Sequence, residues 1–236
     1  ENQIAIPVFA LNKDYTVGVH YMTNVFSSGV KDIYEITTQS GRTVKASENH
    51  PFYKLDGWTR LDKLNIGEKI ALPRSIYTVS PTNPLSEKEL ILHAHLLGDG
   101  CILPKQPYHY TNAYTENINT VQKMARELFG ITPRKVKQNN WYHTYLPSPY
   151  HLTHGRKHPI TLWYKKIGID RVGSYKKQVS PFVFKCDNKY ISVFLRHIWS
   201  TNGNLSWKRL KGRKPTGSIY YATNSHVLAE QIQHLL

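Results

Sequence analysis

One helical segment with a repeated ending constrains the fold of this chain more than any other feature. Residues 86–100 read SEKELILHAHLLGDG. Ser86 and Glu89 form a capping box, the pair of side chains that marks the first turn of a helix. At the other end we expect Gly100 to adopt the left-handed conformation that ends many helices. The segment therefore predicts an apolar helix with Asp99 beside its last, unpaired carbonyl groups.

Asp99 is unusual at that position, because the C-terminal end of a helix carries partial negative charge. A carboxylate there costs about 0.3–1 kcal/mol unless a cation offsets it. An Asp-Gly turn is the ordinary explanation, and a bound divalent metal is the alternative. The metal is favoured by a second copy of the ending: residues 194–203 read FLRHIWSTNG, and Asn202 lies 103 residues after Asp99. Two copies of one unit predict two helices packed side by side.

The residues after the first of these helices predict a unit with the order αββαββα. Its further elements are two short strands within 101–110, a helix over 118–129 capped by Gly130, a hairpin of 134–137 with 141–146, and a helix over 160–167. After the second helix we expect a hairpin over 205–221 and an amphipathic helix over 227–236. Only 33 residues follow Gly203, so we expect the second half of the repeat to be incomplete.

Residues 1–74 show a different pattern, with short runs of period-two alternation that predict a small all-β segment. The expected strands are 4–11, 17–26, 33–38, 42–46 and 69–72. The chain as a whole is predicted to be α+β. Its expected parts are the all-β segment (1–74), a linker reading SIYTVSPTNPL (75–85), a first half-domain (86–173), an inter-half linker (174–187) and an incomplete second half-domain (188–236).

Lysine and arginine are concentrated after residue 74. Residues 1–74 carry a net charge of +1 and residues 75–236 carry +14. A basic segment interleaved with Tyr and Trp favours nucleic acid as its partner. A membrane-surface protein is the alternative, but no amphipathic helix has a lysine-rich polar face and no apolar run is long enough to span a bilayer. Two cysteines, Cys101 and Cys186, suit a reducing compartment, so we expect an intracellular location.

Basic side chains on the predicted strands are the candidates for DNA contacts, because Arg and Lys bind phosphates and read guanine edges. We expect a sheet laid against a DNA groove, in which Tyr108, Tyr110, Trp141 and Tyr142 accompany the basic residues. For each residue taken singly, ordinary solvated surface is the alternative. The candidate set is Lys105, Arg134, Lys135 and Lys137 together with the tip of the second hairpin, Lys208, Arg209, Lys211, Arg213 and Lys214.

Within the N-terminal segment, Ser47 and His50 form an S-x-x-H spacing directly after an expected strand. A hydroxyl and an imidazole so placed polarise a carbonyl or protonate a leaving amide nitrogen, although a solvent-exposed turn histidine is the commoner case. Residues 41–74 resemble the second conserved splicing block of inteins, the self-excising elements with a Hint fold. Gly41 and His50 match that block, and Ser47 replaces its usual Thr. The resemblance implies that His50 assists the first acyl shift at the upstream splice junction.

The two ends of the chain depart from the intein pattern. Inteins begin with a nucleophilic Cys or Ser and end with His-Asn followed by another nucleophile, whereas this chain begins at Glu1 and ends at Leu236. We therefore expect no splicing by this chain alone.

The basic segment resembles the LAGLIDADG homing endonucleases. The motifs that carry this resemblance are LLGDG at 96–100, LTHGRKHPITLW at 152–163, SYKKQV at 174–179 and FLRHIWSTNG at 194–203. Together with the Hint-like segment, their order looks like that of the endonuclease-bearing inteins of bacterial replicative DNA helicases, over essentially the whole chain. The resemblance implies two motif helices at a pseudo-twofold axis and two saddle-shaped sheets that straddle the major groove of DNA.

The resemblance also implies a site for Mg²⁺, or Mn²⁺, shared by the two helix ends. Asp99 takes the first acidic position, with the backbone of Gly98 as a further ligand. Asn202 takes the second position, where an amide is a poorer ligand for a hard cation than a carboxylate. Lys177 matches the lysine that supports the attacking water or the developing charge, and Lys176 is its adjacent competitor.

The function that this implies is site-specific, Mg²⁺-dependent double-strand cleavage of DNA, impaired or limited to nicking by Asn202. Two other classes remain open: a protein-splicing element whose terminal blocks are absent from this chain, and a DNA-binding module without catalysis. The implied partners are double-stranded DNA, the host replicative helicase as extein and, as one way to complete the second half, a complementary C-terminal fragment. No membrane partner is implied, and the implied location is a bacterial cytosol or a plastid.

Zinc is a weaker alternative to magnesium. The residues that suggest it are His151, His154, His158 and Cys186. A glycine and a proline break the helix that would align the three histidines, and the chain has no second cysteine pair. His93 and His95 are two residues apart and so are expected on different sides of their helix.

Overall fold

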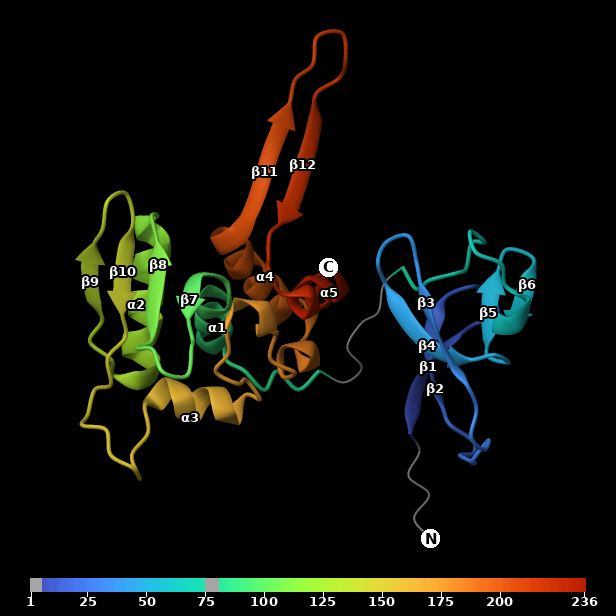
Figure 1. Ribbon diagram of the computed structural model, residues 1–236, viewed down its shortest axis with the longest axis horizontal. Coiled ribbons are helices and arrows are strands. Elements are labelled where there is room, and N and C mark those ends of the chain that lie inside the picture. Colours follow the sequence, from blue (N-terminus) through green and yellow to red (C-terminus); the bar gives the residue numbers. More distant parts are fainter. Residues whose placement is uncertain (1–5, 75–80) are drawn as a thin grey trace. The chain divides into compact units, whose positions relative to one another are not determined.

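The computed structural model describes residues 6–74 and 81–236, and the chain divides into two compact units, Glu1–Val79 and Ser80–Leu236 (Figure 1). The strands pair in antiparallel fashion in both units, and the α-helices lie in the second. This mixture of helices and antiparallel strands is an α+β content, as predicted. The expected linker, 75–85, lies partly outside the described residues, as does the start of the expected strand 4–11.

The first unit is built from β-hairpins. Its elements are β1 (Pro7–Leu11) paired with β2 (Val17–Tyr21), β3 (Ile33–Thr37) with β4 (Thr43–Ser47), β5 (Pro51–Lys54) with β6 (Gly57–Arg60), and the 3-10 helix η1 (Leu61–Lys63). Strand β2 ends five residues before the expected boundary at 26.

The third hairpin differs from the prediction. The expected strand 69–72 is not a strand, and β5 and β6 were not predicted. Residues 55 and 56 form the turn of this hairpin, and Gly57, which pairs with Lys54, has a φ of 118° that favours glycine. Residues 69–72 are irregular, and Ala71 N donates a hydrogen bond to Tyr53 O at 2.7 Å.

The first half of the second unit has the predicted αββαββα order. Its elements are α1 (Glu87–Asp99), β7 (Gly100–Cys101), β8 (His109–Asn112), α2 (Thr115–Phe129), β9 (Arg134–Lys137), β10 (Tyr142–Tyr145) and α3 (Pro159–Lys166). The strands form one antiparallel sheet in the order β7-β8-β10-β9.

The second half repeats the beginning of the first. It contains α4 (Asn188–Asn202), a hairpin of β11 (Gly203–Lys208) with β12 (Thr216–Tyr221), and α5 (His226–Leu235). The hairpin projects from the body of the unit in Figure 1. The segment between the halves, 174–187, was expected as a linker, but it folds into the 3-10 helices η2 (Ser174–Lys176) and η3 (Val183–Lys185) and buries Val179, Val183 and Cys186 in the core.

The caps of the helices test the local predictions. Ser86 Oγ accepts a hydrogen bond from Glu89 N, and Glu89 Oε2 accepts one from Ser86 N at 2.9 Å, so the capping box is confirmed. Gly130 ends α2 in the left-handed conformation, as expected. The prediction for Gly100 is wrong, because its φ of −83° and ψ of 143° lead the chain directly into β7. A Cβ at Gly100 would overlap the backbone of Leu96, so glycine is needed there for a close approach and not for a positive φ.

Helix α1 is apolar on nearly all sides and lies at the centre of the core of the second unit. It packs against α4, as the repeated ending predicted, and also against α2. The two repeated helices approach closely near their C-terminal ends, where a Cβ added to Gly98 would overlap the side chain of Thr201. Thr201 occupies in α4 the position that Gly98 occupies in α1. The ends of both helices therefore lie together. Among the described residues, no helix combines the length and apolar character that crossing a membrane requires.

We expect Gly98→Ala to destabilise the second unit by about 1–3 kcal/mol, because the added methyl group forces Thr201 and its helix to move. The helical circular dichroism signal on heating reports this unit, since the α-helices lie there. Gly155→Ala is the matched control, as its added Cβ would meet open space. The pair Gly98→Ala/Thr201→Gly restores the room and is expected to recover part of the loss, because glycine within α4 itself costs up to about 1 kcal/mol. If the double variant is no more stable than Gly98→Ala, the strain does not arise between positions 98 and 201.

Candidate functional site

The candidate site lies where α1 and α4 end. Asp99 is the last residue of α1 and Asn202 is the last residue of α4. The Asp99 side chain is half-buried and that of Asn202 is exposed. The hydroxyl of Tyr221 is buried beside Asn202. Burial raises the pKa of Tyr221, and the charge of Asp99 adds a smaller rise. Because Tyr221 interacts with both helix ends, the two candidate ligands, Asp99 and Asn202, lie near each other.

Asp99 is held by a hydrogen bond from a residue that sequence reasoning did not single out. Asn112 Nδ2 donates to Asp99 Oδ2 at 2.7 Å. Burial raises the pKa of the Asp99 carboxyl, and the hydrogen bond from Asn112 and the charge of Lys177 oppose that rise. Both opposing effects favour the ionised form, which is the form that binds a cation.

Lys177 supplies the cation that the end of α1 requires. Its Nζ, which has three hydrogens to donate, lies within hydrogen-bonding distance of the carbonyl oxygens of four residues: Leu97 and Gly100 at 2.8 Å, Gly98 at 3.1 Å and Leu96 at 3.4 Å. The lysine is 8% exposed, and burial lowers its pKa to about 8, opposed by the charge of Asp99. Lys176, the competing candidate, is exposed and lies outside this cluster. The ammonium group thus offsets the negative end of the helix beside Asp99.

The donors at the helix ends are oxygens: the Asp99 carboxylate, the Asn202 amide and the backbone carbonyl of Gly98. Such a set suits Mg²⁺, which binds to one or two carboxylates and takes further oxygens from water and from substrate phosphates. The described part of the chain holds no group of three or more His, Cys, Asp or Glu side chains placed for a metal. These residues therefore fit a cation that completes its coordination with water or with phosphate oxygens. The Gly98 carbonyl already accepts a bond from Lys177, so the ammonium and the cation would share that oxygen.

The four-stranded sheet separates basic residues that were expected together. Register pairs Lys135 with Thr144, which is fully buried, and Arg134 with Tyr145 on the opposite face. Lys135 and Lys137 therefore belong to the helix-covered face at its edge, and Arg134 belongs to the opposite face. The reason is strand alternation, which places neighbouring residues on opposite faces.

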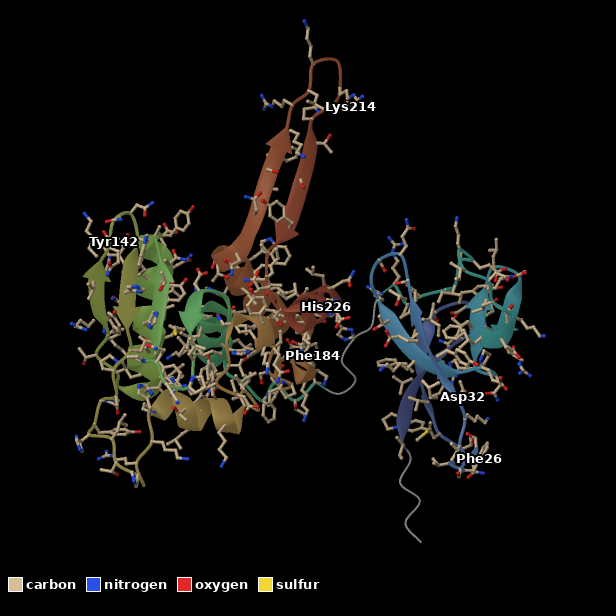
Figure 2. The ribbon with its side chains drawn as sticks, viewed as in Figure 1. Phe26, Asp32, Tyr142, Phe184, Lys214 and His226 are labelled. Carbon is tan, nitrogen blue, oxygen red and sulfur yellow. The ribbon has the colours of Figure 1, made fainter. Side chains whose placement is uncertain are left out.

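The expected aromatic face is also corrected. Tyr108 and Tyr110 are 3% and 0% exposed, so they belong to the core and do not line a groove. Tyr142 lies at the beginning of β10 (Figure 2). The Lys135 ammonium lies 3.9 Å from the centroid of its ring. Lys105 is exposed in the loop between β7 and β8.

The open face of the sheet carries residues that sequence reasoning missed. Register places His109 opposite Tyr145 and Thr111 opposite His143, all on the face that Arg134 shares. Thr111 Oγ1 and His143 Nδ1 are hydrogen-bonded at 2.9 Å, and the rings of His109 and His143 lie 4.9 Å apart. Alternation along two strands would have identified this polar and aromatic face.

The hairpin of β11 and β12 places its basic tip far from the helices. Figure 2 labels Lys214 at the far end of this hairpin. The five basic residues predicted there are exposed: Lys208, Arg209, Lys211, Arg213 and Lys214.

Comparison with known proteins adds a family to this geometry. Residues 189–236, which run from α4 to α5, match the family described as a LAGLIDADG-like domain. The chain contains a LAGLIDADG-like domain. That family comprises homing endonucleases, which act on DNA. The LAGLIDADG-like match includes Asn202 and the basic hairpin.

Relatives extend the similarity beyond the LAGLIDADG-like domain. The chain is 42% identical over 217 residues, 91% of its length, to the replicative DNA helicase DnaB of Synechocystis sp.. It is 39% identical over 97% of its length to the DnaB of Rhodothermus marinus and 24% identical over 98% of its length to the protein RecA of Mycobacterium tuberculosis. The chain spans about a quarter of the length of these relatives, 24% for both DnaB proteins and 28% for RecA.

His50 lies in the first unit, outside the LAGLIDADG-like domain. It is exposed in the turn after β4, where its backbone N–H donates to Ser47 O at 3.0 Å. The Ser47 hydroxyl donates instead to Asn49 Oδ1 at 2.9 Å, and the His50 ring packs against Phe52. The two side chains of the S-x-x-H spacing are thus near in sequence, but no described hydrogen bond joins them.

Three further histidines, His158, His93 and His95, have partners in the fold. His158 caps α3 by accepting from Ile160 N, and its other nitrogen bonds to Leu146 O at 2.9 Å. The ring of His93 accepts from Ser180 N, whereas the ring of His95 lies between Tyr110 and His197. The two histidines of α1 therefore have different surroundings, as their spacing predicted.

Proposed function

We propose that this chain is the endonuclease-bearing part of an intein, and that its second unit cuts DNA at a specific site with Mg²⁺. The observation that carries the proposal is the packing of α1 against α4, which brings Asp99 and Asn202 to one neighbourhood. A carboxylate, an amide and a backbone carbonyl together offer the oxygen donors that Mg²⁺ prefers.

Two further findings support the proposal. The LAGLIDADG-like match covers α4, β11, β12 and α5, and the order α1, β7, β8 and α2 repeats those elements earlier in the chain. The relatives bear two different names, DnaB and RecA, yet the chain aligns with only about a quarter of each. A segment shared by parts of two differently named proteins is what an inserted element would produce. The segment lacks the GxxxxGK[ST] phosphate-binding motif, so the match does not indicate a shared nucleotide site.

In this proposal the residues at the helix ends orient a phosphodiester. A bound Mg²⁺ would polarise the scissile phosphate and lower the pKa of an attacking water. Asp99 contributes the negative charge that holds the cation, and Asn202 and Gly98 contribute neutral oxygens. Lys177 keeps the end of α1 electrically compensated, so that Asp99 is not repelled by its own helix. With one carboxylate between two strands, nicking is expected to precede formation of linear DNA.

A plasmid assay tests the proposal. The substrate carries a replicative helicase gene from which the segment aligned with this chain has been removed, so that the sequences on either side are joined. We expect nicked plasmid in Mg²⁺ and none when chelator is present. A protein that binds this plasmid but leaves it intact in Mg²⁺ would instead be a DNA-binding module.

DNA binding by the basic unit is expected to be steeply salt-dependent, because lysine and arginine release counterions from phosphates. Changing the five tip residues, Lys208, Arg209, Lys211, Arg213 and Lys214, to Gln is expected to reduce the salt slope of the binding constant by about 4. The matched control changes five basic residues of the first unit: Lys31, Arg42, Lys45, Lys63 and Lys69. Fluorescence anisotropy at a series of salt concentrations measures both slopes. If the two variants have equal salt slopes of the binding constant, the hairpin tip does not contact DNA.

Protein splicing is the second candidate function, favoured by the alignment of this chain with only part of two differently named relatives and by His50 in an accessible turn. Its test joins this chain to the flanking splicing blocks of a relative between two reporter proteins. Ligated reporters that are lost on His50→Ala would support splicing. Equal ligation by wild type and His50→Ala would exclude the assigned role of His50.

A further inference from the structure

The pairing register of the strands shows which positions correspond between the two halves of the second unit. Gly100, next to Asp99, pairs with Tyr110, and Gly203, next to Asn202, pairs with Tyr221. Two residues beyond these tyrosines lie Asn112 in the first half and Thr223 in the second. These two positions therefore correspond, although the loops before them differ in length.

Asn112 and Thr223 share one structural task. Asn112 Oδ1 accepts a hydrogen bond from Tyr114 N at 2.7 Å, and Thr223 Oγ1 accepts one from Ser225 N at 3.1 Å. Tyr114 and Ser225 are the residues that immediately precede α2 and α5. Both side chains thus fix the turn from the second strand into the following helix.

Asn112 has a second task that uses the NH₂ group of its amide, which a threonine hydroxyl, one bond closer to the backbone, does not replace. Its Nδ2 donates to Asp99 Oδ2 at 2.7 Å and to the Tyr110 hydroxyl at 3.2 Å. A backbone N–H can only donate, so the bond from Tyr114 fixes which atom of the amide is oxygen and turns its nitrogen toward Asp99. Asn112 is 8% exposed, so this arrangement is shielded from solvent.

A buried chain of polar groups supports Asn112 from behind. The Tyr110 oxygen accepts from Asn112, so its hydrogen is available to His95 Nδ1 at 3.1 Å. The other nitrogen of His95 lies 3.1 Å from Nδ1 of His197, on α4. Burial lowers the pKa of His95 to about 3, so the imidazole is neutral and has one nitrogen to accept and one to donate. The chain therefore joins Asp99 to the opposite motif helix.

We propose that Asn112 is a positioning residue that holds Oδ2 of Asp99 so that Oδ1 is presented to the cation, and that the second half lacks this carboxylate–amide pair as a unit. Where the first half has Asp99 and Asn112, the second half has Asn202 and Thr223. The inference rests on the proposed function for the identity of the cation. It has a direct consequence: a carboxylate restored at position 202 alone lacks the amide that would orient it.

Asn112→Thr tests the first part, because it copies the residue of the second half and retains an oxygen for the turn while removing the donor to Asp99. We expect about a tenfold weaker affinity for Mn²⁺ alone, measured by electron paramagnetic resonance, as is usual when an outer-shell partner of a ligand is lost. Loss of two buried hydrogen bonds is expected to lower the thermal unfolding midpoint, but the protein remains folded at the assay temperature. DNA binding without metal is expected to stay at the wild-type value there, whereas a purely structural defect would weaken it together with Mn²⁺ affinity. Thr223→Ser is the control, since Ser also preserves the turn.

The double variant Asn202→Asp/Thr223→Asn tests the second part. We expect it to form linear plasmid about tenfold faster than Asn202→Asp alone, and Thr223→Asn alone to leave the product nicked. The inference would be overturned if Asn202→Asp and the double variant formed linear plasmid at equal rates and Asn112→Thr kept the wild-type affinity for Mn²⁺. If the wild type still nicked plasmid, the proposed function would stand. Weaker Mn²⁺ binding by Asn112→Thr in a protein that never cuts DNA would support the pair and reject the nuclease. Absence of Mn²⁺ binding by wild type would overturn both.

Discussion

Replacing Asp99 with asparagine is expected to lower the rate of plasmid nicking about a thousandfold. Asp99 is the carboxylate at the joined ends of α1 and α4, and Asn202 contributes no charge there. Loss of that charge weakens a metal interaction worth several kcal/mol in the transition state, and each 1.4 kcal/mol is about a factor of ten in rate. An amide oxygen at position 99 still accepts from Asn112 Nδ2, so the fold is expected to persist. Rates of nicked-plasmid formation at saturating Mg²⁺ measure the effect.

The control for this variant is Asp170→Asn, which removes the same charge from an exposed position in the same unit. It is expected to nick at the wild-type rate. DNA binding by Asp99→Asn, measured without Mg²⁺, is expected to match or slightly exceed that of wild type, since a negative charge near phosphates has been removed. If Asp99→Asn and Asp170→Asn nick equally fast, the chemistry does not depend on the end of α1.

The features that sequence predicted well depend on local chemistry. The capping box of Ser86 and Glu89 is formed by residues three apart, and Gly130 ends α2 through its own backbone conformation. The ends of the two motif helices were also predicted, because an apolar run that closes on a polar residue and glycine repeats in the chain. Such signals need no knowledge of distant neighbours.

The failures arise where a distant neighbour decides the outcome. Gly100 was expected to need a positive φ, but what excludes a side chain there is the backbone of Leu96 one turn earlier. Similarly, Lys135 and Arg134 were grouped by charge, whereas strand alternation places them on opposite faces of the sheet. Composition identifies a basic segment, but the face of the sheet on which each basic side chain lies depends on the alternation of side chains along the strand.

Asn112 shows the same limit at the candidate site. It reaches Asp99 because β8 pairs with β7 across a loop of seven residues, and no local pattern specifies that register. Tyr110, expected on a DNA-contacting surface, instead lies in the core and carries the chain from Asn112 to His95. The sequence provided the ligand, and the sheet register provided the residue that orients it.

Lys177→Met is expected to destabilise the second unit by about 3 kcal/mol, because methionine has a similar length but cannot donate to the carbonyl groups at the end of α1. The nearest of these, on Leu97 and Gly100, each lie 2.8 Å from the ammonium, and an unpaired buried acceptor costs about 1–3 kcal/mol. Removing the buried charge is expected to stabilise the unit in part, since burial disfavours the ammonium and lowers the pKa of Lys177 to about 8. We expect the lost hydrogen bonds to prevail, because at pH 7 the ammonium remains protonated and its charge compensates both the helix end and Asp99.

Amide hydrogen exchange in α1 measures this effect in the second unit alone, without contributions from the first unit. Lys176→Met is the matched control; its side chain is exposed, so a change within about 0.5 kcal/mol is expected. The comparison also separates two roles for Lys177. If α1 exchanges at the wild-type rate in Lys177→Met while nicking is lost, the ammonium serves the reaction and not the helix. Alternatively, hydrogen-exchange protection of α1 and nicking both fall in Lys177→Met, and Lys177→Arg recovers the protection alone. A cation is then sufficient for the helix end, whereas the chemistry needs the compact ammonium of lysine.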